Sequence, residues 1–200
     1  LEKFSKKKLK YSSVPKIYFF SEKYFLKKTN QTLKTIKSQF KDLVAVRSSC
    51  ISEDNSKNSM AGYFYSSLNI DPSKNDEIKS EIFNVINSYK SHKNEKNLVL
   101  IQQMVKNVAY SGVIMTCDKT SNAPYYIIDY TKGSDTTAVT AGSSKNNITF
   151  IYFANSPVEV KNKLEKKIIN FINEIIHVCK NKFIDIEFAI DKSNKIYLLQ

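Results

Sequence analysis

The most constraining feature of the sequence is a short apolar run that ends in one arginine and two serines, LVAVRSS at residues 43–49. The apolar run, with its two valines, predicts a buried strand, and the polar triplet marks the end of that strand. Arg47 is the only arginine among the 31 basic residues of the chain. A planar guanidinium binds two phosphate oxygens at once, which lysine cannot do. Arg47 is therefore either a phosphate-binding residue or a surface arginine that happens to follow a strand.

The composition predicts a globular protein of one domain or two small lobes. Of 200 residues, 42% are hydrophobic and 12% are aromatic, which excludes wholesale disorder. Cys50, Cys117 and Cys179 lack any metal-binding spacing, as expected of reduced thiols in a cytoplasmic protein. No apolar run approaches the roughly 20 residues of a membrane span, and no signal-peptide pattern is present. The chain begins with Leu1 and not with Met, so we expect it to be part of a longer polypeptide.

Positive charge is concentrated at the beginning of the chain. The net charge is +12, and residues 1–41 contain 12 lysines but only Glu2 and Glu22 as acids. A basic block of this kind can bind nucleic acid or an anionic membrane. It has no arginine, no glycine and no base-reading motif. A lysine-rich solvated face, or contact with an acidic domain outside this chain, is therefore the favoured interpretation, and no membrane partner is expected.

The apolar pattern predicts an α+β fold with two lobes, residues 1–95 and 96–200, divided at the polar linker 91–96 that contains His92. Helices are predicted at 1–10, at 22–40 with Ser21 as N-cap, at 76–89, and at 156–180 with a Ser156–Glu159 capping box. Strands are predicted at 14–20, 43–47, 63–70, 98–104, 111–116, 125–130, 147–153, 183–190 and 195–200, the last two joined by a hairpin around Asp191.

Two groups of residues could carry chemistry, although the common nucleotide, hydrolase and zinc motifs are absent. Gly62 closes a serine-containing loop at 50–62, which either encloses a polyphosphate with its backbone N–H groups or is an ordinary surface loop. Asp185 and Glu187 alternate with apolar residues and so share one face of a strand. The pair either holds Mg²⁺, with Gln200 on the partner strand as a further oxygen donor, or forms an exposed acidic face.

Three stretches, in this order, resemble the ATP-grasp domain of the phosphoenolpyruvate synthase and pyruvate phosphate dikinase family. They are VAVRSSCISED at 44–54 with the later Ala61-Gly62, IQQMVKNVAYSGVIMT at 101–116, and DIEFAID with IYLLQ at 185–200. The resemblance implies an ATP-grasp fold with antiparallel-rich sheets, flanking helices and ATP between two lobes. Further family motifs would precede Leu1 and follow Gln200, so both lobes are expected to be truncated.

The resemblance also implies roles for individual residues. Arg47 would contact the phosphates and act with Glu187 in catalysis, while Asp185 and Glu187 would hold Mg²⁺. The remaining ATP-binding residues would be Ser48, Ser49, Gly62, Gln102, Met104, Val105, Thr116 and Gln200. Within that set, the segment 102–105 would run past the adenine.

Residues 125–142 differ from the glycine-rich stretch usual in this family and resemble the branch found in surface-polysaccharide pathways, notably the glutamine kinase of capsule phosphoramidate synthesis. That branch implies phosphoryl transfer from ATP to a histidine on a swivelling domain of the same polypeptide, and then to a small acceptor such as L-glutamine, with release of AMP and phosphate. Neither His92 nor His177 lies in a matching motif. Three alternatives stay open: another acceptor, as in phosphoenolpyruvate synthase or antibiotic phosphotransferases; a non-catalytic nucleotide-binding scaffold; and a basic module that binds nucleic acid.

Overall fold

The computed structural model describes residues 1–49, 65–89, 94, 97–118, 120–133 and 147–200. These residues form two compact units. The first unit is Lys16–Met104, and the second unit combines Leu1–Pro15 with Val105–Gln200. This division differs from the predicted lobes, because the chain leaves the first unit after residue 104 and residues 1–15 belong with the second unit.

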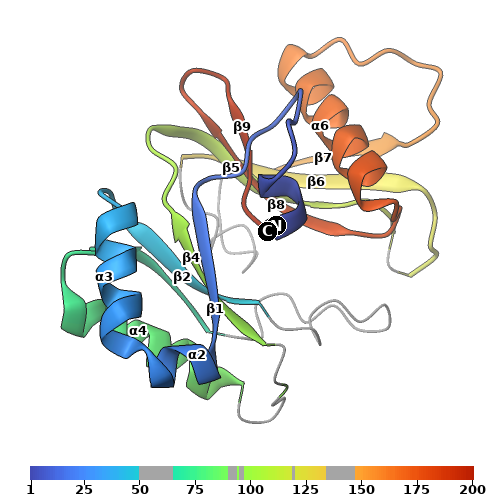
Figure 1. The fold of residues 1–200 in the computed structure, drawn as a ribbon. Coiled ribbons are helices and arrows are strands. Elements are labelled where there is room, and N and C mark those ends of the chain that lie inside the picture. The colour runs from blue at the N-terminus through green and yellow to red at the C-terminus, as the bar shows by residue number, and fades with distance from the viewer. Residues whose placement is uncertain (50–64, 90–93, 95–96, 119, 134–146) are drawn as a thin grey trace. The chain divides into compact units, whose positions relative to one another are not determined.

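The first unit is a four-stranded antiparallel sheet with helices on one face (Figure 1). The strand order is β1-β4-β2-β3. Its elements are β1 Ile17–Ser21, α2 Glu22–Lys27, α3 Thr29–Gln39, β2 Val44–Ser49, β3 Ser66–Ile70, α4 Asn75–Ser88 and β4 Leu98–Gln103. Val44 and Val46 of β2 share one buried core with Ile36 of α3 and Ile82 of α4. Residues 44–46 of the LVAV run therefore lie in a core strand, as predicted, whereas Leu43 precedes β2 and is 45% exposed.

The helix predicted over 22–40 is two helices. Ser21 is the N-cap as predicted, since its Oγ accepts a hydrogen bond from the backbone N–H of Tyr24 at 3.2 Å. Lys28 leaves the helical region, with φ −133° and ψ 34°, and separates α2 from α3. The Thr29 hydroxyl donates to the Phe25 carbonyl at 2.8 Å, a backbone contact of the kind that bends helices.

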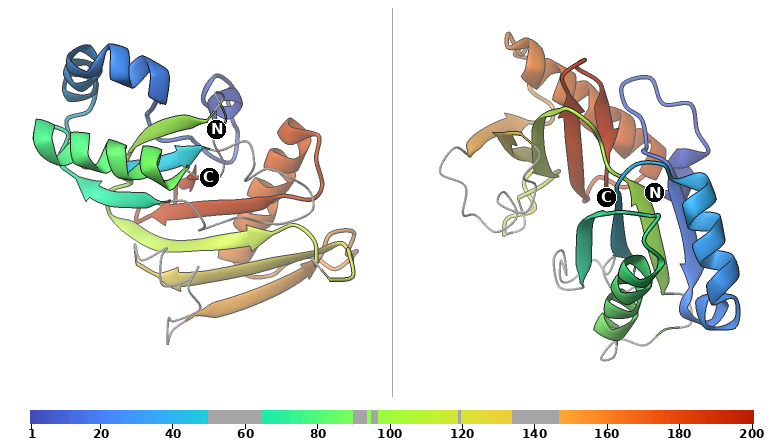
Figure 2. Two further views of the ribbon diagram at one scale, coloured as in Figure 1. Left: turned by 90° about the horizontal axis from the view of Figure 1, so that it is seen from below. Right: turned by 90° about the vertical axis from the view of Figure 1, so that its left-hand side faces the viewer.

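The second unit is a five-stranded antiparallel sheet covered on one face by a long helix (Figure 2). The strand order is β7-β6-β5-β8-β9. Its elements are α1 Glu2–Ser5, β5 Val108–Met115, β6 Tyr125–Lys132, β7 Ile148–Phe153, α6 Lys163–Cys179, β8 Asp185–Asp191 and β9 Ile196–Leu198. Phe171 and Ile172 of α6 pack with Ile114, Ile128 and Phe188 of the sheet in the core of this unit.

Helix α6 begins at Lys163 and not at the predicted capping box. Its N-cap is Asn162, whose side chain accepts hydrogen bonds from the N–H groups of Leu164 and Glu165. Ser156 forms only a local turn, in which its Oγ accepts from the N–H of Val158 at 3.1 Å. The predicted start was wrong because Asn162 satisfies the free N–H groups of the first turn later in the chain.

Each predicted strand overlaps an observed strand, and the α+β prediction is confirmed by two antiparallel sheets with their helices. The hairpin predicted around Asp191 joins β8 to β9. Within the described ranges, no helix is both long and apolar enough to cross a lipid bilayer.

Candidate nucleotide site

Arg47 lies in the interior of the sheet of the first unit, on β2 between β4 and β3. Successive side chains of a strand point to opposite faces, and Val44 and Val46 point into the helix-covered core. Arg47 therefore belongs to the other face. Its exposed fraction is only 7%. A buried cation requires anionic or hydrogen-bonding neighbours, so this arginine is not the ordinary surface residue that the sequence also allowed.

Gln102 lies on the same face as Arg47, on the adjacent strand. Arg47 of β2 pairs with Leu100 of β4. Ala45, two residues before Arg47, pairs with Gln102, two residues after Leu100. Gln102 is also buried, with an exposed fraction of 2%. The structure thus places two residues that the sequence predicted to bind ATP, Arg47 and Gln102, on one face of adjacent strands.

The two serines after Arg47 are on different faces of β2. Ser49 shares the face of Arg47, whereas Ser48 shares the face of Val44 and Val46 and is buried. The backbone N–H of Ser49 donates to the Tyr89 hydroxyl at 2.9 Å, and that hydroxyl donates to the Leu98 carbonyl at 2.6 Å. Tyr89, which the sequence analysis treated only as part of a helix, holds the end of β2 beside the start of β4.

The segment 102–105 contains the boundary between the two compact units. The N–H of Met104 donates to the Leu43 carbonyl at 2.9 Å, and the N–H of Gln103 donates to the Lys16 carbonyl at 2.9 Å. Both N–H groups are therefore used to anchor the segment to the first unit. The Val105 N–H forms no backbone hydrogen bond within the described residues.

Asp185 and Glu187 lie on one face of β8 in the second unit, as predicted. Ile186 and Phe188 point into the core beneath α6, so the two carboxylates belong to the opposite face of the sheet. Asp185 is exposed and Glu187 is half-buried. The Glu187 N–H donates to the Gln200 carbonyl at 2.8 Å, which places Gln200 directly beside Glu187.

This arrangement suits a hard divalent cation, because it offers carboxylate and amide oxygens without nitrogen or sulfur ligands. Asp129 is a further carboxylate on this face: it pairs with Val113 of β5, which in turn pairs with Glu187. Asp129 accepts a hydrogen bond from Thr149 Oγ1 at 2.5 Å. Two strand spacings, about 10 Å, separate it from Glu187. No cluster of three metal-ligating His, Cys, Asp or Glu side chains occurs in the described part of the chain.

Thr116 serves the structure of the second unit. Its hydroxyl lies 2.6 Å from the Lys182 carbonyl and 3.0 Å from the Ile184 carbonyl, and it accepts from the Ile184 N–H at 2.8 Å. These bonds fasten the end of β5 to the segment that leads into β8. We therefore leave Thr116 out of the proposed ATP-binding set.

Several predicted features lie outside the described residues: Gly62 and the loop 50–62, Ala61, His92 with most of the linker 91–96, and residues 134–142 of the variant stretch.

Similar solved structures define the class of fold. VanG D-Ala:D-Ser ligase from Enterococcus faecalis is 12% identical, with a TM-score of 0.50, over 94% of this chain and 47% of its own. D-alanyl-alanine synthetase A from Vibrio cholerae O1 biovar eltor is 14% identical, with a TM-score of 0.50, over 94% of this chain and 48% of its own. PH1788 from Pyrococcus horikoshii Ot3 is 13% identical, with a TM-score of 0.50, over 93% of this chain and 81% of its own.

The chain therefore has an ATP-grasp fold, and it spans about half the length of the two ligases. Residues 21–174 match the family described as pyruvate phosphate dikinase, AMP/ATP-binding domain. The chain belongs to that family. No curated protein sequence matches it. The family supports ATP as the ligand, and the resemblance noted in the sequence is confirmed at this level.

Proposed function

We propose that this chain is the nucleotide-binding part of an ATP-dependent phosphotransferase. In this proposal ATP, water and an acceptor yield AMP, phosphate and the phosphorylated acceptor, with a histidine on another domain of the same polypeptide as the relay. The observation that carries the proposal is the family match over residues 21–174, together with the Arg47 and Glu187 faces of the two sheets.

In the first unit, Arg47 would bind phosphate oxygens of ATP. Its guanidinium belongs to the sheet face opposite the core that contains α3 and α4, and Gln102 and Ser49 share that face. A guanidinium fork forms two parallel hydrogen bonds to a phosphate, which fixes the direction of the phosphate chain as well as its charge. Phosphoryl transfer depends mainly on such positioning and on charge stabilisation.

In the second unit, Asp185, Glu187 and Gln200 would hold Mg²⁺. The bound ion would supply charge neutralisation on the phosphate oxygens. The protein contributes the spacing, because β8 fixes the two carboxylates on one face and the backbone pair with Gln200 fixes the third oxygen donor beside Glu187. Glu187 is central to this set, so we assign it the main role.

The adenine would be recognised by the backbone of the segment 102–105. The N–H groups of Gln103 and Met104 are already engaged, whereas the Val105 N–H forms no backbone hydrogen bond within the described residues. The Met104 carbonyl and the Val105 N–H are therefore the groups that we propose to pair with the adenine edge.

For the acceptor, we propose the amide of L-glutamine. The support is the resemblance of residues 125–142 to the glutamine kinase branch of capsule phosphoramidate synthesis. We also propose a cytoplasmic location, supported by three scattered cysteines and by the ATP that the reaction needs.

The first experiment is calorimetric titration of the full-length protein with Mg-ATP. Replacing Arg47 with lysine keeps the positive charge but removes the planar guanidinium fork. The variant Arg47→Lys should therefore lose one charge-assisted hydrogen bond to ATP, which contributes about 1.5–3 kcal/mol. We expect its affinity for ATP to be about 10-fold to 100-fold weaker. Lys34→Arg makes the reverse exchange at an exposed position of α3 and should bind ATP like the parent.

Two outcomes would overturn the proposal: no Mg-ATP binding by the full-length protein, or equal affinity of the Arg47→Lys variant and the parent. The acceptor is tested separately by incubating the full-length enzyme with ATP and candidate amides and following AMP and phosphorus resonances. A phosphorylated product that still forms at the parental rate in Glu187→Ala would exclude the catalytic role of Glu187.

A further inference from the structure

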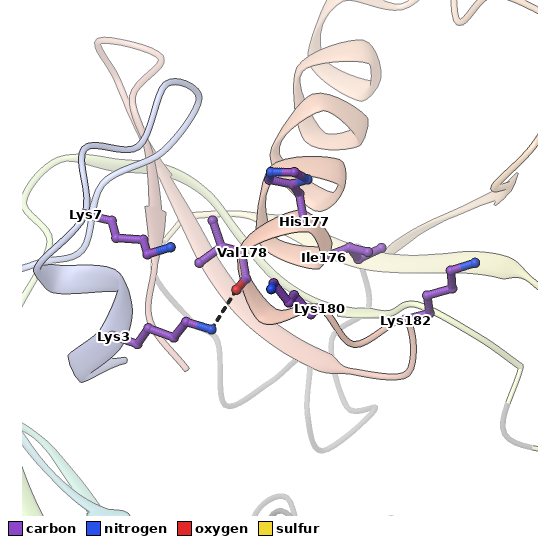
Figure 3. Close-up of a pocket in the computed structure, with 7 residues that line it drawn as sticks. All are labelled: Lys3, Lys7, Ile176, His177, Val178, Lys180 and Lys182. Atoms are coloured by element: carbon purple, nitrogen blue, oxygen red, sulfur yellow. Dashed lines mark hydrogen bonds between the residues drawn. The ribbon is translucent and has the colours of Figure 1, made fainter.

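A basic pocket lies at the C-terminal end of α6 in the second unit (Figure 3). It has a volume of about 590 Å³, which is in the range of small-molecule sites. Its lining residues are Lys3, Lys7, Ile176, His177, Val178, Lys180 and Lys182. Four lysines from two distant parts of the sequence thus line this pocket together with the aliphatic side chains of Ile176 and Val178. None of these residues belongs to the proposed ATP-binding set.

The positive charge of this pocket is not compensated by the neighbouring acids. None of the described lining residues is acidic, and none of the four lysines forms an ion pair within the described part of the chain. Among the acids near these residues in the sequence, Asp185 lies three residues after Lys182, is exposed and belongs to the proposed cation site on β8, whereas Glu2 and Glu174 are engaged by other partners. Glu2 of α1 pairs with Lys6 at 2.5 Å, and Glu174 of α6 accepts hydrogen bonds from the N–H of Tyr11 and from Ser12 Oγ.

The pocket is fixed in place by backbone contacts. Lys3 Nζ donates to the Val178 carbonyl at 2.8 Å and so joins α1 to the last turn of α6 (Figure 3). Lys180 ends α6 in the left-handed conformation, with φ 57°, and its N–H donates to the Ile176 carbonyl at 2.9 Å. The C-terminal end of a helix disfavours anions. The hydrogen bond from Lys3 satisfies one of the free carbonyl groups at this helix end, that of Val178. The other three lysines of the pocket are left to bind an anion.

We propose that this pocket binds a compact anion with two or more phosphate groups. Ammonium groups at several points around a hollow suit an oligophosphate, whose charges are close together. The lining contains no tyrosine or phenylalanine, and its one aromatic ring is the imidazole of His177, so the lysines outnumber the groups on which a nucleobase could stack. Duplex nucleic acid, by contrast, is bound by cations spread along an extended surface. The recognised chemistry is therefore the phosphate chain, whether inorganic or part of a nucleotide.

The test uses the full-length protein at low ionic strength with tripolyphosphate as the probe. The chain has two histidines, so the ring resonances of His177 can be assigned with His177→Gln and followed by NMR. We expect tripolyphosphate to shift these resonances with saturation, and ATP without Mg²⁺ to shift them in the same direction. Adenosine should leave them unchanged. A shift by ATP but not by tripolyphosphate would show that the site requires a nucleotide and would overturn the proposal.

A charge-matched pair of variants separates the pocket from the general positive charge. Lys7→Gln/Lys182→Gln removes two pocket charges whose side chains make no hydrogen bond within the described residues, and it should weaken tripolyphosphate binding at least tenfold. Lys161→Gln/Lys163→Gln removes two exposed charges elsewhere in the second unit and should change the affinity less than twofold. Unaltered far-ultraviolet circular dichroism and an unaltered thermal midpoint without ligand would verify the fold of each variant.

Equal affinities of the two double variants would overturn the proposal, as would stronger competition by a DNA duplex than by tripolyphosphate. Neither result affects the proposed ATP site, because that site is tested through Arg47 and Mg-ATP.

Discussion

Gly112 has no room for a side chain in the sheet of the second unit. A Cβ at this position would lie 2.2 Å from the Asp129 carbonyl oxygen and 2.8 Å from Tyr130 Cα. Both are backbone atoms of β6, so that strand would have to move. Gly112→Ala should therefore lower the free energy of unfolding by about 1–3 kcal/mol, the usual cost of overpacking, as measured by urea unfolding.

Gly133→Ala provides the comparison. Gly133 has φ +96°, so a side chain there causes backbone strain, but no heavy atom of the described residues lies within 4 Å of the position that a Cβ would take. Only Gly112→Ala should accelerate amide hydrogen exchange along the β5–β6 ladder, where Gly112 faces Tyr130. Since Val113 of β5 pairs with Glu187, the same variant should also disturb the proposed cation site. Parental stability of Gly112→Ala would contradict the close approach of β5 and β6.

Sequence alone could predict which candidate residues share a face but not which of them serve the fold. The two-residue period of a strand was enough to place Asp185 and Glu187 together, away from the core. It could not show that the Thr116 hydroxyl bonds to the backbone at Ile184, or that Tyr89 holds Ser49. Those contacts join residues that are far apart in the chain, and no local pattern encodes them.

At the scale of secondary-structure elements, the N-terminus of α6 tests how a helix start is chosen. Asn162→Ala removes the side chain that accepts from Leu164 N–H at 2.9 Å, and it should destabilise the protein by about 1 kcal/mol in thermal unfolding followed by circular dichroism. Ser156→Ala changes the residue of the predicted capping box, which lies outside the helix, and should have an effect below about 0.5 kcal/mol. A larger loss in Ser156→Ala would mean that the helix begins earlier.

The sequence contains two candidate starts for this helix, and the local signals do not separate them. Ser156 with Glu159 fits a capping box, and Asn162 with Glu165 has the same spacing. Packing decides between them. The buried stripe of α6 begins at Ile168, whereas Val158 is 71% exposed. Residues 156–162 would therefore gain little burial as a helix, and the later start is favoured.

At the scale of the whole molecule, the division into units follows strand pairing and not linker composition. The polar linker 91–96 suggested a boundary near residue 95, but β4 pairs with both β1 and β2 and so belongs to the first unit. At the other end, Phe4 packs in the core of the second unit, and Ser13 bridges Tyr197. Such long-range pairing has no signature in a single sequence, although the strands themselves do.

The whole chain should be most stable on a broad plateau between about pH 5 and pH 9. On the acid side, hydrogen bonds from serine side chains lower the pKa of three half-buried aspartates: Asp71 by Ser73, Asp118 by Ser121 and Asp191 by Ser193. A carboxyl with a lowered pKa stabilises the fold above its unfolded value, about 4, and this stability is lost as the pH falls through the folded value.

On the alkaline side, stability is lost as the pH rises and not as it falls, because burial raises the pKa of Tyr126 and of Tyr130. These phenols stabilise the fold below the pKa of an unfolded tyrosine, about 10, and that contribution is lost as the pH rises through the folded pKa values.

The measurement is the urea midpoint by circular dichroism from about pH 2 to about pH 11, a range that spans both limbs. Ser193→Ala removes the main cause of the shift at Asp191, so it should flatten the acid limb and leave the alkaline limb unchanged. An acid limb equally steep in this variant would show that the turn at Asp191 does not contribute, and that the acid sensitivity originates in other carboxyls.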